Sequence, residues 1–582
     1  MFCEICQRNF SQPAASTIPP PSISSTDLQQ LLRSPYPPSA AQVSEILGIV
    51  TNIDAEIRHY EARILRLQSE MKLLENKQQQ LKIRRQRYNS LLAPVRRLHT
   101  EVLDHVFVMY ANIVGCNMNF IGPSLIFLPG QTLMSVCVRW REIANSCKPL
   151  WTSIALELGS TENVDVITET LQWCLDHAGP TAPLNIILRD IAVEDTDIEE
   201  PEFCKLLTAQ ASRWRELSLY TQGNLGAMLP SIFEVENPSF PSLEALCPVT
   251  PRELGLFSNA PKLHELSFSG VADMEGDKPV FPWSQIKTLK LKLYNQHRIP
   301  ITPSLFPELE SLSYTLSSFL SIMPDIPYHT LNTLQALSVS LAKAGPNTGP
   351  PKALRKILES ACYPALRRLV VDFNMYATYN AYVVVGHDAE ELGWPQHEVT
   401  SFILRSGCSL TFLQLRDAFI STRDLLALLL HTPALSHLEF YQPHRCKPIE
   451  EQLKNMVPAQ MGLEPLTMAW IKRLHAHGTE DSYDFGNPLV PKLTHLSLTV
   501  LSDWFDDDQL FVNVILSRWV PDPILASEIG VACLKSVELK VWGRLLDDKV
   551  YQPLLQLGNL AGMKVELLSE IPPVPIAAPY AL

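Results

Sequence analysis

A short apolar pattern recurs along most of the chain: an apolar residue, two others, an apolar residue, one other and an apolar residue. Copies begin at Trp151, Trp214, Leu243 (truncated), Leu263, Ile286, Leu309, Leu334, Leu366, Leu410, Leu435, Leu493 and Leu534. Alternation of this kind predicts short strands, and a strand with one buried face cannot bury it alone. Stacking the copies predicts a curved parallel sheet over residues 157–582, with helices or irregular segments outside it.

The spacing of the copies supports this architecture. From Leu243 to Leu334 they follow at 20, 23, 23 and 25 residues, within the range of leucine-rich repeats. Between copies, Ile167, Leu171, Cys174 and Ala178 predict a helix that ends at Gly179. The run 425–430 predicts another outer helix. We therefore expect an α/β fold, a leucine-rich-repeat-like solenoid; the alternative is an unrelated α/β domain with coincidental leucine spacing.

A second periodicity runs from Ile46 to Leu92, where apolar positions alternate in steps of four and three. It is typical of a heptad seam, and Pro94 follows it as a stop. The seam residues are Ile46, Val50, Ile53, Ile57, Tyr60, Ile64, Leu67, Met71, Leu74, Gln78, Leu81, Arg85, Tyr88 and Leu92. Two alternatives remain open for residues 46–92: a coiled coil that self-associates or binds a partner helix, and a long helix folded back on its own body.

Residues 93–156 predict a small helical domain, and residues 1–45 a disordered tail rich in Ser and Pro. One predicted helix carries Val102, Leu103, Val106 and Phe107 on one face. After a break with Pro123, Pro129 and Gly130, a second is predicted through Leu133, Val136, Cys137, Trp140 and Ala144 at helical spacing.

The amino-acid sequence of this segment resembles the F-box. The matching stretches are Pro94–Phe107, then Val136-Cys137-x-x-Trp140 with Ile143, then Leu150-Trp151. In particular, the chain is similar to fungal F-box-like proteins that place a coiled-coil helix before the box and a Leu-rich region after it. Where members usually carry Leu-Pro at the start, this chain has Leu98-His99, and its link over 111–130 is longer than usual.

The resemblance implies a docking role without catalysis. An F-box binds a Skp-type adaptor, which bridges to a cullin–RING ubiquitin ligase core, and a few large apolar anchors dominate such helix-in-groove contacts. The adaptor-binding candidates implied by the motif are Leu98, Glu101, Val102, Leu103, Val106, Phe107, Val136, Cys137, Trp140 and Ile143. The solenoid would hold an unknown protein substrate as the recognition subunit of an SCF-type ligase. The alternative is a coiled-coil scaffold with a degenerate box and no ligase role.

Composition narrows the remaining function classes. The net charge of −13 argues against a nucleic-acid partner, and only 23 Gly in 582 residues leave few phosphate-binding loops. No nucleophile, metal or cofactor motif is apparent, so we expect no enzyme activity, no cofactor and no metal. Cys3-x-x-Cys6 lacks a second pair, and His475-x-His477 lacks a third ligand. The acidic cluster Asp503, Asp506, Asp507 and Asp508 lacks the Gly turn of a calcium loop and is interpreted as solvated.

The cysteines and the absence of long apolar runs bear on location. Twelve scattered Cys do not form a dense disulfide framework, and no apolar run approaches the length of a membrane span. Residues 1–20 lack the order of a secretory signal. The sequence thus predicts a cytoplasmic or nuclear protein with free thiols and no membrane partner.

Overall fold

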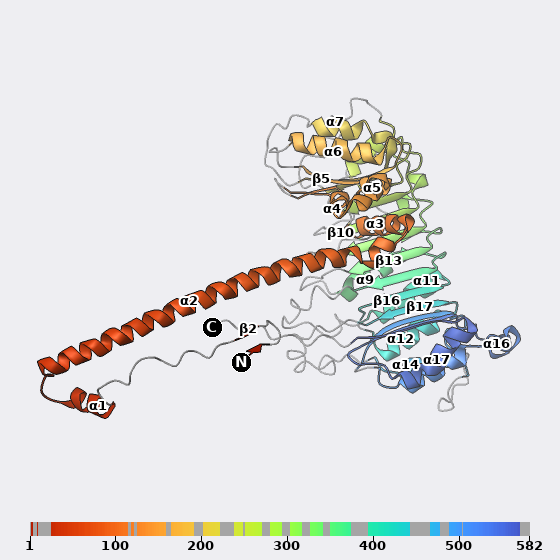
Figure 1. The fold of residues 1–582 in the computed structure, drawn as a ribbon. Helices are drawn as coiled ribbons and strands as arrows, with labels where there is room; N and C mark the ends of the chain where they lie inside the picture. Colours follow the sequence, from red (N-terminus) through yellow and green to blue (C-terminus); the bar gives the residue numbers. More distant parts are fainter. Residues whose placement is uncertain are drawn as a thin grey trace. The chain divides into compact units, whose positions relative to one another are not determined.

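The computed structural model describes residues 2–3, 8–9, 25–114, 118–121, 125–158, 164–190, 202–220, 238–247, 251–269, 280–293, 303–316, 326, 328–341, 350–373, 394–418, 420–442, 466–477, 488–502 and 505–570. The chain divides into two compact units, Met1–Val102 and Leu103–Leu582. This division does not separate the predicted helical domain 93–156 from the predicted repeat region 157–582. Figure 1 shows the helices and strands of both units.

The first unit is dominated by one helix, α2 (Ala40–Leu91), preceded by α1 (Ser25–Arg33) and followed by η1 (Pro94–Arg97). A capping box starts α2: the Ser39 amide donates to Gln42 Oε1 (2.9 Å), and the Gln42 amide donates to Ser39 Oγ (3.4 Å). The helix therefore begins six residues before the predicted Ile46. The prediction of a disordered tail is wrong for residues 25–33 and 40–45, which are helical.

A short antiparallel pair, β1 (Phe2–Cys3) and β2 (Arg8–Asn9), lies before these helices. Cys3 belongs to β1, whereas Cys6 lies outside the described residues. Pro94 occupies the first position of η1, and α2 ends before it, as the sequence predicts.

The second unit is built on one large sheet of sixteen strands among the described residues, in the order β20-β19-β18-β17-β16-β15-β13-β11-β10-β9-β8-β7-β6-β5-β3-β4. The strands are β3 (Met118–Ile121), β4 (Leu125–Phe127), β5 (Ser153–Leu158), β6 (Leu184–Asp190), β7 (Trp214–Tyr220), β8 (Ala245–Cys247), β9 (Glu265–Ser269), β10 (Thr288–Leu293), β11 (Ser311–Leu316), β13 (Ala336–Leu341), β15 (Arg368–Asp372), β16 (Phe412–Arg416), β17 (His437–Tyr441), β18 (His495–Leu501), β19 (Ser536–Trp542) and β20 (Lys564–Glu570). Among the described strands of this sheet, only the β3–β4 pair is antiparallel.

From β5 to β20 each strand of the large sheet pairs in parallel with the strand before it in that sheet. The register aligns residues at the same position of the repeat. One aligned row is fully buried: Leu266, Leu289, Leu312, Leu337, Leu369, Leu413, Leu438, Leu496 and Val537. Residues between the buried ones are partly accessible, as the alternation in β11 and β18 shows. One face of the sheet therefore forms the core, and the other is accessible.

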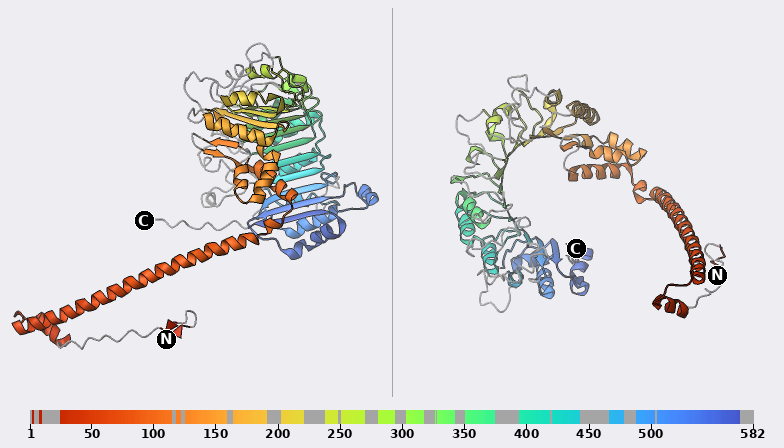
Figure 2. Two further views of the ribbon diagram at one scale, coloured as in Figure 1. Left: turned by 45° about the horizontal axis from the view of Figure 1, so that its top comes forward. Right: turned by 90° about the vertical axis from the view of Figure 1, so that its left-hand side faces the viewer.

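Helices and 3-10 turns connect the strands on the buried face. The helices are α6 (Val164–Ala178), α7 (Glu202–Thr208), α9 (Pro350–Glu359), α11 (Gln396–Ser406), α12 (Thr422–Leu430), α14 (Ala469–Lys472), α15 (Asp508–Arg518), α16 (Pro523–Ile529) and α17 (Asp548–Ala561). The 3-10 turns are η5 (Ala211–Arg213), η6 (Pro251–Phe257), η7 (Trp283–Gln285) and η8 (Pro303–Leu305), and β12 (His329–Thr330) pairs with β14 (Ala361–Cys362) in a second small sheet. In Figure 2 (right), α9, α11 and α12 lie outside the curved row of strands.

Both helices predicted between the strands are confirmed. Helix α6 ends at Gly179, whose φ of 75° is the left-handed conformation that glycine favours. Helix α12 buries Leu425, Leu428 and Leu429 against the sheet. The parallel α/β sheet is thus as expected.

The segment before β5 differs from prediction in one respect. It contains α3 (Thr100–Val114), α4 (Pro129–Met134), α5 (Val138–Ser146) and η3 (Lys148–Trp151). The single helix predicted through Leu133 and Ala144 is wrong, because Cys137 is extended (φ −164°, ψ 170°) and separates α4 from α5. Val136 and Trp140 therefore do not share one helix face.

Candidate partner-binding surface

Helix α3 has two apolar stripes, one buried and one exposed. Leu103, Phe107 and Ala111, spaced four apart, are buried at 0–4% exposure. Val106 and Met109 are 45% and 51% exposed, and Val102 one turn earlier is 46% exposed. A helix with a buried stripe normally presents polar residues elsewhere, so a second, exposed apolar stripe is typical of a binding face.

Helix α5 and the turn before it add two more exposed apolar side chains. Val136, in the turn after α4, is 57% exposed, and Val138, at the start of α5, is 65% exposed. The break at Cys137 turns both side chains outward. Helices α3 and α5 touch through the rings of Phe107 and Trp140, whose centroids are 4.9 Å apart at 60°.

The Trp151 side chain contacts residues of α4, α5 and α6 and so fixes the short helices on the sheet. Its ring is 1% exposed, and its Nε1 donates to the Ala144 carbonyl at 2.9 Å. The ring also meets the Trp173 ring of α6 edge-on, with centroids 4.9 Å apart. Gly130 of α4 lies against the other side, where an added Cβ would come within 2.4 Å of the ring. The exposed stripe therefore stands on a rigid support that joins it to the sheet.

The ten adaptor-binding candidates fall into three groups. Leu103, Phe107 and Ile143 are buried and hold the helices together. Leu98, Cys137 and Trp140 are partly buried. Glu101, Val102, Val106 and Val136 are exposed. The motif did not include Met109 and Val138; the i, i+3 spacing of Met109 from Val106 was the available signal for the first.

A second concentration of large side chains lies on the accessible face of the sheet. Arg368, Phe412, His437 and His495 are paired in register across four adjacent strands. The Arg368 guanidinium carbon lies 3.5 Å from the Phe412 ring centroid, and the two imidazoles stack at 4.0 Å with 8° between their planes. Burial lowers the pKa of both histidines, which favours the neutral rings that stack. This row places three aromatic rings and one guanidinium side by side, and aromatic and Arg side chains are enriched at protein interfaces.

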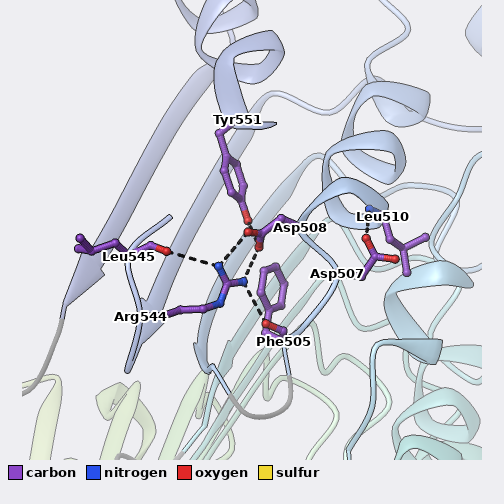
Figure 3. Close-up of polar contacts among 7 residues, drawn as sticks. All are labelled: Phe505, Asp507, Asp508, Leu510, Arg544, Leu545 and Tyr551. Atoms are coloured by element: carbon purple, nitrogen blue, oxygen red, sulfur yellow. Dashed lines mark hydrogen bonds and ion pairs between the residues drawn. The ribbon is translucent and has the colours of Figure 1, made fainter. Parts of the chain in front are cut away.

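The acidic cluster singled out in the sequence has a structural role at the residues described (Figure 3). Asp508 accepts hydrogen bonds from Arg544 (2.5 and 2.8 Å) and from the Tyr551 hydroxyl (2.7 Å). Burial raises the pKa of Asp508, but the bonds from Arg544 and Tyr551 outweigh it and leave that pKa below its usual value. Asp507 caps α15 by accepting from the Leu510 amide at 2.8 Å. Asp503 lies outside the described residues. Asp508 therefore ties α17 to α15, and the interpretation of this residue as solvated is wrong, whereas Asp506 and Asp507 are exposed.

Among the described residues, no group of three or more His, Cys, Asp or Glu side chains could hold a metal ion. His475 and His477 stay close, with ring centroids 5.9 Å apart, but gain no third ligand there. None of the described helices is both long and apolar enough to cross a lipid bilayer. Eight described cysteines carry free thiols, among them Cys147 and Cys174, and burial raises the pKa of the Cys174 thiol to about 12.

Comparison with known proteins adds no relative. No protein-family model matches the chain, and no curated protein sequence matches it significantly.

Proposed function

We propose that the chain is the substrate-recognition subunit of an SCF-type cullin–RING ubiquitin ligase, with no catalytic chemistry of its own. Helices α3 to α5 would form the F-box and bind a Skp-type adaptor. The sheet and its helices would form a leucine-rich-repeat-like solenoid that holds the target protein. This role belongs to the cytoplasm or nucleus.

One observation carries the proposal: apolar residues of the F-box-like segment include both a buried set and an exposed set. Leu103 and Phe107 form the core of the segment, while the motif residue Val106 and its neighbour Met109 are exposed. A helix that must both fold on its own body and fill a groove on another protein needs two such stripes. The sequence resemblance to the F-box supplies the identity of that other protein.

The mechanism would be proximity. A target held on the accessible face of the sheet, where Phe412 and His437 stack, stays near a ligase core recruited through α3. Tethering raises the effective concentration of the target's lysines at that core and needs no reacting group on this chain.

Adaptor binding by the full chain tests the proposal. Val106→Glu with Met109→Glu should weaken binding to a purified Skp-type adaptor by roughly 100-fold, since two anchors of about 1.4 kcal/mol each are lost. Substitution of Leu103 or Phe107 is uninformative because both are buried. The matched control is Leu404→Glu with Leu430→Glu on α11 and α12, which are 63% and 60% exposed and should bind like wild type.

A second candidate function follows from the exposed apolar row on α2. The chain would then be a coiled-coil scaffold whose box no longer reaches a ligase. Wild-type chain that shows no adaptor binding at about 10 μM, a weak limit for a specific complex, would favour the scaffold over the ligase subunit.

A further inference from the structure

Helix α2 carries an apolar row that its own unit does not cover. None of its 52 residues is buried. Along the row, Val50, Ile57, Ile64 and Met71 are 44–57% exposed, and Leu74 and Leu81 are 63% and 64% exposed. Isolated helices gain little stability from propensity alone, so a row of this length needs a covering surface.

The step pattern assigns each seam residue to one of the two core positions of a heptad. The a positions hold Val50, Ile57, Ile64, Met71, Gln78, Arg85 and Leu92; the d positions hold Ile46, Ile53, Tyr60, Leu67, Leu74, Leu81 and Tyr88. The flanking e and g positions then begin with an acidic block (Asp54, Glu56 and Glu61) and end with a basic block (Lys77, Lys82 and Arg84), and Arg63, Glu70 and Glu75 lie between the two blocks.

A second copy in parallel, in-register orientation would meet like charges. Each g residue faces the e residue five positions along the other helix, which pairs Glu56 with Glu61 and Lys77 with Lys82. In the seam, Arg85 would lie against Arg85 of the second copy. Like-charge flanks and a paired cation in the seam both oppose this orientation.

An antiparallel second copy replaces the contacts of Glu56 with Glu61 and of Lys77 with Lys82 by contacts between opposite charges, and it leaves Glu75 near Glu61 and Lys77 near Arg63. When residue 46 lies opposite residue 92, all fourteen seam residues stay covered, and Arg85 lies beside Ile53 of the second copy. In this orientation e residues face e residues and g residues face g residues, so Asp54 lies near Lys82 of the second copy and Glu56 lies near Arg84. The Arg85 stem can pack on Ile53 while its charged end reaches solvent.

We propose that α2 is a self-association surface that pairs with α2 of a second copy in antiparallel orientation. Opposite charge blocks at matching distances from residue 69 set the direction, and the exposed heptad row supplies the buried area. This inference is independent of adaptor binding.

Charge reversal at Lys82 has opposite effects on dimer affinity in the two orientations. In the antiparallel pair Lys82 lies between Asp54 and Glu61 of the second copy, so Lys82→Glu should weaken dimerisation roughly tenfold in low salt. In a parallel pair the new glutamate would face Lys77 of the second copy, so the same substitution should strengthen dimerisation. Adding Asp54→Lys and Glu61→Lys should restore the dimer. Arg87→Glu makes the same charge change at an outward heptad position and should leave the dimer unchanged.

Sedimentation equilibrium of the full chain measures these dissociation constants, and zero-length carbodiimide cross-linking reads the orientation directly. Asp54 and Lys82 are about 42 Å apart in one helix at 1.5 Å per residue, so a cross-link between them can only join two antiparallel copies. Recovery of that cross-linked peptide from a dimer supports the proposal. A monomeric wild-type chain at about 100 μM, a dimer without this cross-link, or a tighter Lys82→Glu dimer would overturn it.

Discussion

Arg518 gives the sharpest test of how the carboxyl-terminal part of the sheet is held. It ends α15 at 1% exposure, and its guanidinium donates only to backbone carbonyls: Nε to Leu474 (2.6 Å), one terminal nitrogen to Val490 (2.9 Å) and the other to Leu489. Burial lowers the pKa of Arg518 to about 10, so the group stays charged at neutral pH. One side chain thus joins the end of α15 to two earlier stretches of the chain, one at Leu474 and one at Leu489 and Val490.

Arg518→Met keeps the aliphatic stem and removes all three donors. An unsatisfied buried carbonyl costs about 1–3 kcal/mol, and some of the three will regain water, so we expect a loss of about 3–5 kcal/mol in the local unfolding free energy. Arg518→Lys retains one compact donor group and should lose less, because an ammonium cannot span three carbonyls.

Amide hydrogen exchange is the appropriate assay, because an array of neighbouring strands can open in parts. Protection should fall at Leu474 and Leu493, whose amides donate to nearby carbonyls of the same region (2.9 and 3.1 Å). The matched control, Arg423→Met on the exposed side of α12, should change nothing. Protection in Arg518→Met within about 0.5 kcal/mol of wild type, the range of neutral surface changes, would refute the reasoning.

Two further predictions concern packing and pH. Gly130→Ala should lower the stability of the α3–α5 segment by about 1–3 kcal/mol, measured by thermal unfolding, because the new Cβ would overlap the Trp151 ring; an unchanged melting temperature would contradict this packing. Burial lowers the pKa of His437 below its usual value of 6.5. As the pH drops below about 6.5, the unfolded chain therefore binds a proton at this imidazole before the folded chain does, and the free energy of unfolding should fall. His437→Gln should flatten that pH dependence in acid-unfolding curves, and an identical slope would contradict the assignment.

The strands were largely predictable because each repeats one spacing. All twelve predicted copies coincide with strands of the sheet, whereas the sequence analysis did not predict β3 and β4, which precede the first copy, or β6 and β20, which belong to the repeat region. In β6 and β20, the position that should open the unit with an apolar residue holds another residue: Pro183 before β6 and Gly562 before β20. Gly562 instead ends α17 in the left-handed conformation (φ 71°), which glycine favours. This end of the helix takes the place of the apolar residue that the repeat would put there.

The candidate surface was only half predictable. Helical spacing groups Val102, Leu103, Val106 and Phe107 on one apolar arc, but it cannot tell which side of the arc meets the body. That choice depends on Trp140 and Trp151, which approach α3 and α4 from later in the chain. The helix break at Cys137 was missed for the same reason, since apolar residues continue at helical spacing through it.

The chain-order pairing of the strands also dictates a direction of folding. Each strand can pair as soon as it is synthesised, because its neighbour has already emerged. The cost of closing each connection then sets the pace: paired residues of β9 and β10 lie 23 positions apart (265 and 288), but those of β17 and β18 lie 58 apart (437 and 495). The entropy of closing the connection makes the pairing of β18 with β17 about 0.8 kcal/mol more costly than the pairing of β10 with β9. Folding during translation should therefore pause when β17 is the last strand added to the sheet.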